Sequence, residues 1–596
     1  MNGAQAEYQE RRDDRRKRLT QAEAEVRLIS NLRLAVFAVG LVIVMVAWMT
    51  GVSVLWLVPP GVVFFALVVA HERASRRAVR ARRATEHYQA GLRRIEGSWP
   101  GHGNQRTDIA PDDHPYAADL DLFGPGSLFE RLCMARTGAG VQTLAQWLLA
   151  PADPDTVRQR QAAVEDLSNR LDLREELALA GAALESEIDP AFLVAWGTRP
   201  PSIDPSRVRL AGALAWTMAI ANVSAAVAWG WADVGIGPLA LTLGATWVAG
   251  RPFRGMTDKV LFAVERPSRE LAVVAEVLRR LEQQSFEAPR LQALRKELSG
   301  GETGAGASIQ RLVRLVAWLD ASRSGLFAPV GFALMWTLHF GIALEAWRAK
   351  HGPRIETWFA ALGELEALAS LSAYAFEREN DVFPEFIEGP PCIDGQGLGH
   401  PLLAADVCIC NPVTLGPDRR ALMISGSNMS GKSTYLRAVG VAVVLAQAGA
   451  PVYADYLRLT PLRVGATLRV QDSLQAGASR FFAEIKRLRT VMDVAHEGPG
   501  LLFLLDEILH GTNSHDRRLG AEAVLAGLIK RDAIGLVTTH DLALAQAAEA
   551  MPAVVDNVHF ADEIIDGKLV FDYRMKPGTV TTSNALDLMR AVGLDV

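Results

Sequence analysis

The chain has 596 residues, too many for a single domain, and 49% of them are hydrophobic while 22% are charged. Its net charge of −5 argues against a protein that coats nucleic acid through overall positive charge, although a local basic groove remains compatible with it. The four cysteines show no metal-binding spacing beyond one C-x-C pair, so reduced thiols in a reducing compartment are expected at Cys133, Cys392, Cys408 and Cys410.

Residues 1–95 are expected to form a basic N-terminal segment and a first transmembrane hairpin. The stretch 34–70 contains no charged residue, which is too long for one span and suits two spans with a turn near Thr50–Gly51. Arginine clusters lie on both sides, at 11–18 and 71–83, and this bias places both ends in the cytoplasm. A buried helical hairpin of a soluble core is the weaker interpretation, because the stretch has no polar face.

The middle of the chain is predicted to be helical, in three parts. Residues 96–205 are expected to form a soluble helical region. Residues 206–255 are expected to form a second transmembrane hairpin, because 210–250 contains one charged residue, Asp233, and arginines lie on both sides. Residues 256–385 carry long helical patterns that lead into the carboxyl-terminal domain.

A third apolar stretch, 324–344, is long enough to span a membrane. Four earlier crossings return the chain to the cytoplasm, so a fifth would place everything after it outside, including the nucleotide-binding motif described next. Pro329 and His339 also weaken a simple span. A core helix or a membrane-surface helix is therefore expected here.

The strongest motif lies in residues 424–434 and contains G-x-x-x-x-G-K-S between Gly426 and Ser433. An apolar strand precedes it and an apolar-periodic helix follows, which is the context of a phosphate-binding loop. Lys432 would reach the β- and γ-phosphates, and the Ser433 hydroxyl would ligate Mg²⁺. The predicted ATP contacts are Gly426, Ser427, Asn428, Met429, Ser430, Gly431, Lys432, Ser433 and Thr434.

Two further strands end in residues suited to nucleotide hydrolysis. The apolar run 501–505 ends in Asp506, expected to hold the Mg²⁺ shell, and Glu507, expected to activate water. The strand 534–539 ends in His540, which could sense the γ-phosphate. A solvated acid pair and a structural histidine are the alternatives, and the order of the three motifs argues against them.

These motifs resemble those of the MutS DNA mismatch-repair ATPases. The resemblance covers residues 426–435, 505–514 and 538–540, together with 463–466 and 472–484, which resemble that family's signature segment. It implies an α/β P-loop NTPase domain of ABC type over 386–596, preceded by an all-α MutS-core-like region that carries the two transmembrane hairpins. It further implies ATP and Mg²⁺ as cofactors and a homodimer in which Ser479 reaches the partner's ATP.

The sequence also departs from the family. Membrane spans occupy the N-terminal part, where mismatch readers carry an aromatic wedge beside a glutamate, and no such motif is recognised there. Ser430 stands where the loop often has glycine, Arg480 replaces a small hydroxyl residue, and Cys408 replaces an adenine-stacking aromatic. DNA is thus a candidate partner, with non-specific or branched DNA ahead of mismatched DNA.

The leading hypothesis is a multi-pass cell-membrane protein with a cytoplasmic ATPase domain that closes as a dimer around ATP. A transporter-like ATPase that uses its own spans is the first alternative, with Asn222 as the lone polar candidate inside them. A membrane scaffold in which ATP acts only as a switch is the second.

Overall fold

The computed structural model of the chain describes residues 3–51, 53–111, 113–181, 190–200, 205–232, 234–253, 268–300, 303–321, 327–469, 480–496, 498, 500–509, 514–540, 551–565 and 568–579. They form two compact units, which are described separately. The first comprises residues 1–133, 145–175 and 370–596, and the second comprises residues 134–144 and 176–369.

The first unit begins with a long helical hairpin, α1 (Gly3–Thr50) and α2 (Val58–Glu96), joined by the short helix η1 (Val54–Leu57). The turn begins at Gly51, whose φ of +72° suits a residue without a side chain. Proline at the first turn of α2 is tolerated because the N–H groups there have no partner within the helix. Gly97, at φ +80°, ends α2.

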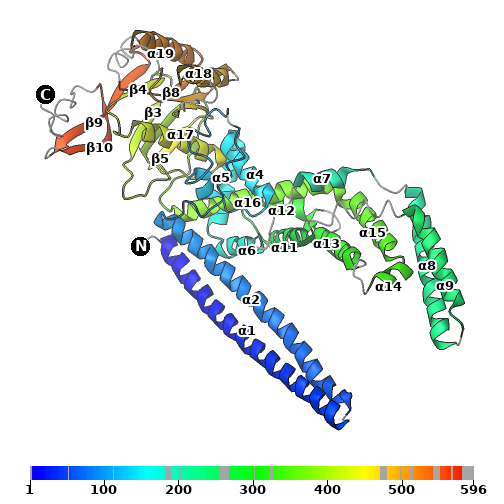
Figure 1. The fold of residues 1–596 in the computed structure, drawn as a ribbon. Coiled ribbons are helices and arrows are strands. Elements are labelled where there is room, and N and C mark those ends of the chain that lie inside the picture. The colour runs from blue at the N-terminus through cyan, green and yellow to red at the C-terminus, as the bar shows by residue number, and fades with distance from the viewer. Residues whose placement is uncertain are drawn as a thin grey trace. The chain divides into compact units, whose positions relative to one another are not determined.

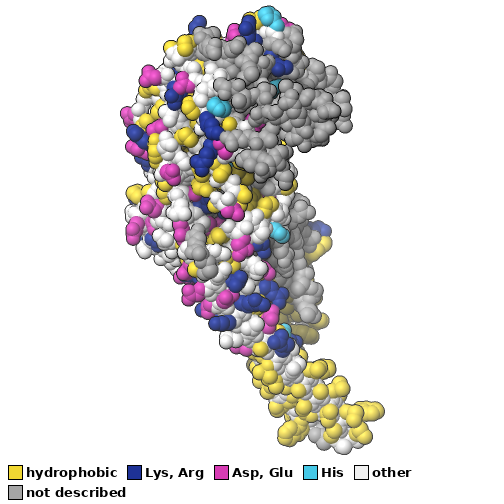
Figure 2. Space-filling view, turned by 90° about the vertical axis from the view of Figure 1, so that its left-hand side faces the viewer, with side chains coloured by type: hydrophobic (Ala, Val, Ile, Leu, Met, Phe, Trp, Pro, Cys, Tyr) yellow, Lys and Arg dark blue, Asp and Glu magenta, His cyan; other side chains and the backbone are white. Residues whose placement is uncertain are grey.

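Both helices of this hairpin are long and apolar enough to cross a membrane, and their apolar windows have no buried residue. Figure 2 shows the free end of the hairpin as a continuous apolar surface without acidic or basic side chains. The position of this surface agrees with the charge-free stretch in the sequence.

The opposite end of the hairpin is tied to the body of the unit. Tyr8, Tyr88 and Leu92 form a small buried cluster with Leu171. The Arg15 guanidinium donates two hydrogen bonds of 2.9 Å to the Glu175 carboxylate. Arg94 donates from α2 to Glu377, whose side chain is 1% exposed. These contacts fix the base of the hairpin.

The carboxyl-terminal part of this unit is an α/β domain with two sheets (Figure 1). The larger sheet has the order β10–β9–β4–β8–β7–β6, in which all neighbours are parallel except β9 and β10. Its strands are β4 (Ala421–Ser425), β6 (Arg463–Thr467), β7 (Leu501–Leu505), β8 (Ile534–Thr539), β9 (Val555–Ile565) and β10 (Lys568–Pro577). The smaller sheet, β1–β5–β2–β3, has the strands β1 (Glu385–Phe386), β2 (Ile393–Leu398), β3 (Asn411–Leu415) and β5 (Tyr456–Leu459).

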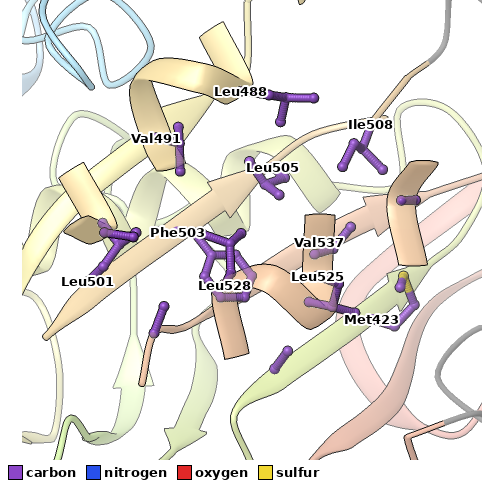
Figure 3. Packing of buried hydrophobic residues seen from close by; sticks show 14 of the residues in the cluster. Met423, Leu488, Val491, Leu501, Phe503, Leu505, Ile508, Leu525, Leu528 and Val537 are labelled. Atoms are coloured by element: carbon purple, nitrogen blue, oxygen red, sulfur yellow. The ribbon is translucent and has the colours of Figure 1, made fainter. Parts of the chain in front are cut away.

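Three helices of this domain pack on the larger sheet: α17 (Lys432–Ala448), α18 (Arg480–His496) and α19 (Ser514–Ile529). Every residue of β4, β7 and β8 is buried, which is typical of parallel strands covered on both faces. Figure 3 shows one side of this core, where Phe503 of β7 lies among Leu528 of α19 and Val491 of α18. The core fixes the carboxyl ends of the strands, where the site lies.

Helices α3 (Leu128–Leu132) and α5 (Pro154–Ser168) complete this unit, while α4 (Gly138–Leu149), α6 (Leu171–Gly181) and α16 (Ile355–Glu377) have residues in both units.

The second unit is helical. Its elements are α7 (Pro190–Thr198), α8 (Pro205–Trp231), α9 (Gly237–Gly250), η2 (Arg251–Phe253), α11 (Ser268–Gln283), α12 (Pro289–Ser299), α13 (Ala305–Ala321), α14 (Ala328–Ala333), α15 (Trp336–His351) and η3 (Gly352–Arg354).

The expected second hairpin is present as α8 and α9, and Asp233 at its turn lies outside the described residues. Residues 208–231 of α8 are long and apolar enough to cross a membrane. The expectation of a full return span is not met by α9. It has 14 residues and rises about 21 Å, while a hydrocarbon core is roughly 30 Å thick. The second hairpin is therefore strongly asymmetric.

The third apolar stretch also differs from a single helix. It forms two helices, α14 and α15, separated at Leu334 and Met335. Met335 takes a left-handed conformation with φ +48°, which interrupts the helical hydrogen bonding. Both helices pack against α8.

Candidate nucleotide-binding site

The carboxyl ends of three parallel strands bring the predicted motifs together. In the sheet register Ser425 of β4 lies beside Thr539 of β8, and Leu505 of β7 lies beside Val537 of β8. The glycine loop, the two acids and His540 each follow one of these strands. Parallel strands end at the same edge of a sheet, so these segments converge there.

The loop after β4 has the backbone of a phosphate cradle. Gly426 and Gly431 take φ values of +151° and +100°, which only glycine adopts without strain. Met429, at φ +70° and 83% exposed, bulges outward between them. The hydroxyl oxygens of Ser427 and Ser430 are buried and have no hydrogen-bond partner among the described residues. Unsatisfied donors in such a loop fit a phosphate ligand.

Lys432 begins α17 and is buried, at 4% exposure. Its Nζ donates to the carbonyl oxygens of Gly426 at 2.9 Å and Ser427 at 2.7 Å. Burial lowers the pKa of Lys432, and the nearby carboxylates, Glu507 first among them, oppose that shift. The ammonium group is therefore bonded to carbonyl oxygens of its own loop, and phosphate oxygens would replace these partners when a nucleotide binds. Ser433 and Thr434, next in α17, line the same cavity.

Thr538 organises the acidic pair and was not predicted as a site residue. Its hydroxyl donates to Asp506 Oδ1 and accepts a 3.0 Å hydrogen bond from the backbone N–H of Glu507. Glu507 is in the left-handed region, at φ +50°. Such a conformation costs free energy for a residue with a Cβ, so the hydrogen bond that the Glu507 N–H donates to the Thr538 hydroxyl helps hold this residue in place.

His540 stands at the edge of this arrangement. Its Nδ1 lies 3.5 Å from Glu507 Oε1, and both side chains are about one-third exposed, at 38% and 31%. The structure thus places the predicted water-activating acid and the predicted γ-phosphate sensor side by side.

A cavity of about 620 Å³ opens in front of the loop. Asn428, Lys432 and Glu507 line one part of it, and the segment 398–411 lines another with Leu403 and Cys408, among others. Its size suits a nucleotide, and its mixed polar and apolar walls suit phosphates and a base respectively.

Tyr573 and Phe560 also line this cavity, and neither was singled out from the sequence. Tyr573 lies on β10 at φ +52°, within an irregularity of the β9–β10 pairing. The Asn411 side chain bridges this irregularity. Its amide donates to Tyr573 O at 3.0 Å and accepts from the Met575 N–H at 2.8 Å. An aromatic ring thus faces the cavity whose wall contains Cys408.

Two buried carboxylates bind residues that precede and follow 470–479. The segment 470–479, with the predicted trans contact Ser479, lies outside the described residues. Before it, Asp119 Oδ1 accepts hydrogen bonds from the N–H groups of Leu468 at 2.7 Å and Arg469 at 2.9 Å. Asp119 Oδ2 pairs with Arg487 of α18. On the same helix, Glu484 accepts a bond from the N–H of Leu509, two residues after Glu507. The start of α18 is thereby connected to the acidic loop.

The residues present fit Mg²⁺ with ATP. Mg²⁺ is usually bound by one or two carboxylates together with phosphate oxygens and water. Asp506 and the Ser433 hydroxyl are the side chains that would hold it, and when bound it would neutralise phosphate charge.

Comparison with known proteins agrees with this geometry. Residues 422–595 match the family model of MutS domain V. A curated relative, the DNA mismatch repair protein MutS 2 of Halobacterium salinarum, is 34% identical over 253 residues. That match covers 41% of this chain and 28% of the relative, so the chain spans under a third of the relative's length.

Proposed function

We infer from this similarity that the chain belongs to the MutS family through its carboxyl-terminal domain, and from this premise we propose that it is a membrane-anchored ATPase that closes as a homodimer around ATP. MutS family members are ATPases. The observation that carries the proposal is the convergence of Lys432 and Glu507 on one cavity, with Asp506 held next to Glu507 by Thr538. The same unit also carries a helical hairpin with an exposed apolar end.

The residues would divide the work as follows. Lys432 and the loop N–H groups bind the phosphates, and Ser433 and Asp506 hold Mg²⁺. Glu507 accepts a proton from the attacking water, and His540 orients that carboxylate and senses the γ-phosphate. Ser479 of one protomer would complete the site of its partner. Tyr573 would stack on the base, which compensates for the missing aromatic at Cys408.

The test is ATP turnover by the full chain in lipid nanodiscs. Glu507→Gln is expected to bind ATP as the natural protein does, to hydrolyse it about 100-fold more slowly, and to accumulate as a closed dimer. Glu388→Gln, an exposed position outside the cavity, is the matched control. Unchanged turnover in Glu507→Gln would show that another residue activates the water.

DNA remains a proposed partner, as does mismatch repair as a process. Non-specific or branched DNA is favoured over mismatched DNA, because the N-terminal part of the chain forms a helical hairpin where mismatch readers carry their wedge. Any contact would then be with the phosphate backbone.

The transporter alternative receives less support from the structure. Asn222, its lone polar candidate, donates hydrogen bonds to Thr246 Oγ1 and to the carbonyl oxygen of Ala333, both at 2.8 Å. Such bonds join helices to one another, which is a structural use of an intramembrane amide.

A further inference from the structure

Helix α8 is much longer than its partner α9, with 27 residues against 14. Part of α8 is therefore left without cover by α9. The broken pair α14–α15 covers it, and Ala215 of α8 is fully buried in a cluster with Met335 and Leu338. The apolar stretch 327–344 thus packs as a third element of the hairpin.

A buried amide fastens the three elements together at the helix break. Asn222 of α8 is 2% exposed and reaches both Thr246 of α9 and the carbonyl oxygen of Ala333. Ala333 ends α14, where carbonyl groups lose their helical partners. In a bilayer, broken backbone is tolerated only where protein satisfies it. Asn222 provides that partner.

Part of α14 remains apolar and exposed, whereas α15 packs against α13 as well as α8. Residues 327–344 include no Asp, Glu, Lys or Arg. Val330 is 49% exposed and Phe332 is 41% exposed, both on α14. The next charged residues, Glu345 and Arg348, form a buried pair at 2.6 Å farther along α15. Charge is thus confined to one end of α15.

Tryptophans surround the helix break, as is usual where a protein meets the headgroup region. Trp336, just after the break, donates its indole N–H to the carbonyl oxygen of Trp318, which is 51% exposed. Trp216 of α8 lies against His339, with 4.7 Å between the ring centroids. Arg251, at the end of α9, lies 3.8 Å over the ring of Trp247.

We propose that the tip of α14–α15, the part around the break at 334–335 that includes Val330 and Phe332, is inserted into the cytoplasmic leaflet of the membrane beside α8 and α9. The segment then leaves on the side from which it entered. The proposal rests on the proposed membrane location and adds a third membrane element to the second unit. The occupant of the exposed face formed by Val330 and Phe332 is lipid. A segment that enters and leaves on one side does not change the side of the membrane on which the chain continues, whereas a crossing would.

The test compares nitroxide probes at three matched positions in the full chain in nanodiscs. The four native cysteines are first replaced by serine, and ATP binding is used to confirm folding. Phe332→Cys reports on the tip. Val227→Cys, on α8 and 55% exposed, is the lipid reference, and Phe192→Cys, on α7 and 42% exposed, is the water reference. Collision with oxygen measures contact with lipid, and collision with a soluble nickel chelate measures contact with water.

The tip probe is expected to behave like position 227 and unlike position 192, with high oxygen access and low nickel access. A tip probe that collides with nickel as position 192 does, while position 227 stays in lipid, would overturn the insertion and leave the membrane anchor intact. Nickel access at position 227 as well would instead overturn the membrane location of this hairpin.

A second pair of variants requires no cysteine replacement. Phe332→Glu is expected to lower the melting temperature in nanodiscs by several degrees more than Phe192→Glu, because a charge at a lipid-facing site is costly. Equal losses at the two positions, which have nearly equal exposure, would contradict the insertion.

Discussion

Lys432 is a buried cation whose Nζ, within the part of the chain that the structure describes, donates hydrogen bonds to two carbonyl oxygens of its own loop. Burial lowers its pKa, so the free protein holds this side chain at a cost. Phosphate oxygens would offer a stronger partner, because they carry a negative charge that attracts the ammonium group and the carbonyl oxygens carry none. The free energy stored in the free site thus favours nucleotide binding.

Lys432→Ala is therefore expected to weaken ATP binding at least tenfold, or about 1.4 kcal/mol. Titration with a fluorescent ATP analogue measures this directly. Lys530→Ala removes an exposed lysine at the end of the α19 region and serves as the control. Equal affinity of Lys432→Ala and the natural protein would contradict the assignment of the loop.

His400 makes the stability of the folded state depend on pH. Burial, and to a lesser extent Arg437, lower the pKa of His400 to about 4. Its Nδ1 accepts the N–H of Leu402 at 3.3 Å, which requires the neutral ring. The folded state therefore binds this proton less readily than the unfolded state, whose pKa is about 6.5.

The sign follows from linkage. His400 contributes on the order of 3 kcal/mol to the free energy of unfolding, and this contribution is fully present above pH about 6.5 and is lost as the pH falls toward 4. The melting temperature is expected to fall between pH 7.5 and pH 5, and His400→Gln is expected to reduce that fall. Gln keeps an acceptor for Leu402. His496→Gln, at an exposed site, controls for histidine loss. An unchanged pH dependence in His400→Gln would exclude this role.

At the scale of elements, a segment that is distant in sequence from the ATPase motifs contacts the residues on either side of one of them. Asp119 lies between the hairpin and α3, yet its side chain is 1% exposed against β6 and α18. It fixes the chain on both sides of 470–479, the segment expected to reach the partner protomer. Asp121, two residues on, pairs with Arg437 and Arg469 at a more exposed position.

Asp119→Asn is expected to lower the kcat for ATP at least tenfold, because breaking a buried ion pair costs about 3–5 kcal/mol locally. Nucleotide affinity is expected to change less than threefold, because the substitution leaves the phosphate-binding loop unchanged. Asp121→Asn, in the same segment, is expected to change kcat less than threefold because surface pairs contribute about 0–1 kcal/mol. Steady-state kinetics at several ATP concentrations separate kcat from KM. Equal behaviour of the two variants would remove the positioning role.

The limits of the sequence are also clearest at this scale. The motif strands and α17 could be predicted because glycine spacing and apolar runs are local signals. Tyr573, Asn411 and Asp119 could not be, because each acts through a contact with a distant segment. The short α9 was missed for a related reason. Composition marks an apolar stretch but does not fix where its helix ends.

At the scale of the whole molecule, the proposed role separates ATP turnover from mismatch recognition. A protein that contacts only the DNA backbone gains no free energy from a mispaired base. We expect at most a slight preference for mismatched over matched duplex, and affinity that falls steeply with salt. Competition titration of the full chain at near-physiological salt measures both. A preference of about tenfold, or roughly 1.4 kcal/mol, would reveal a mismatch reader among the helices.

The length of α1 sets the distance between the apolar end of the hairpin and the body of the first unit. Arg15 is tied to the body of the first unit, and the apolar stretch begins at Leu34. The helix rises about 28 Å from Arg15 to Leu34, which is more than three Debye lengths of about 8 Å at physiological ionic strength. Along this stalk the field of anionic headgroups is screened before it reaches the base of the hairpin. ATP, itself an anion, would therefore approach its cavity as it does in bulk solution, at a rate indifferent to the charge of the bilayer.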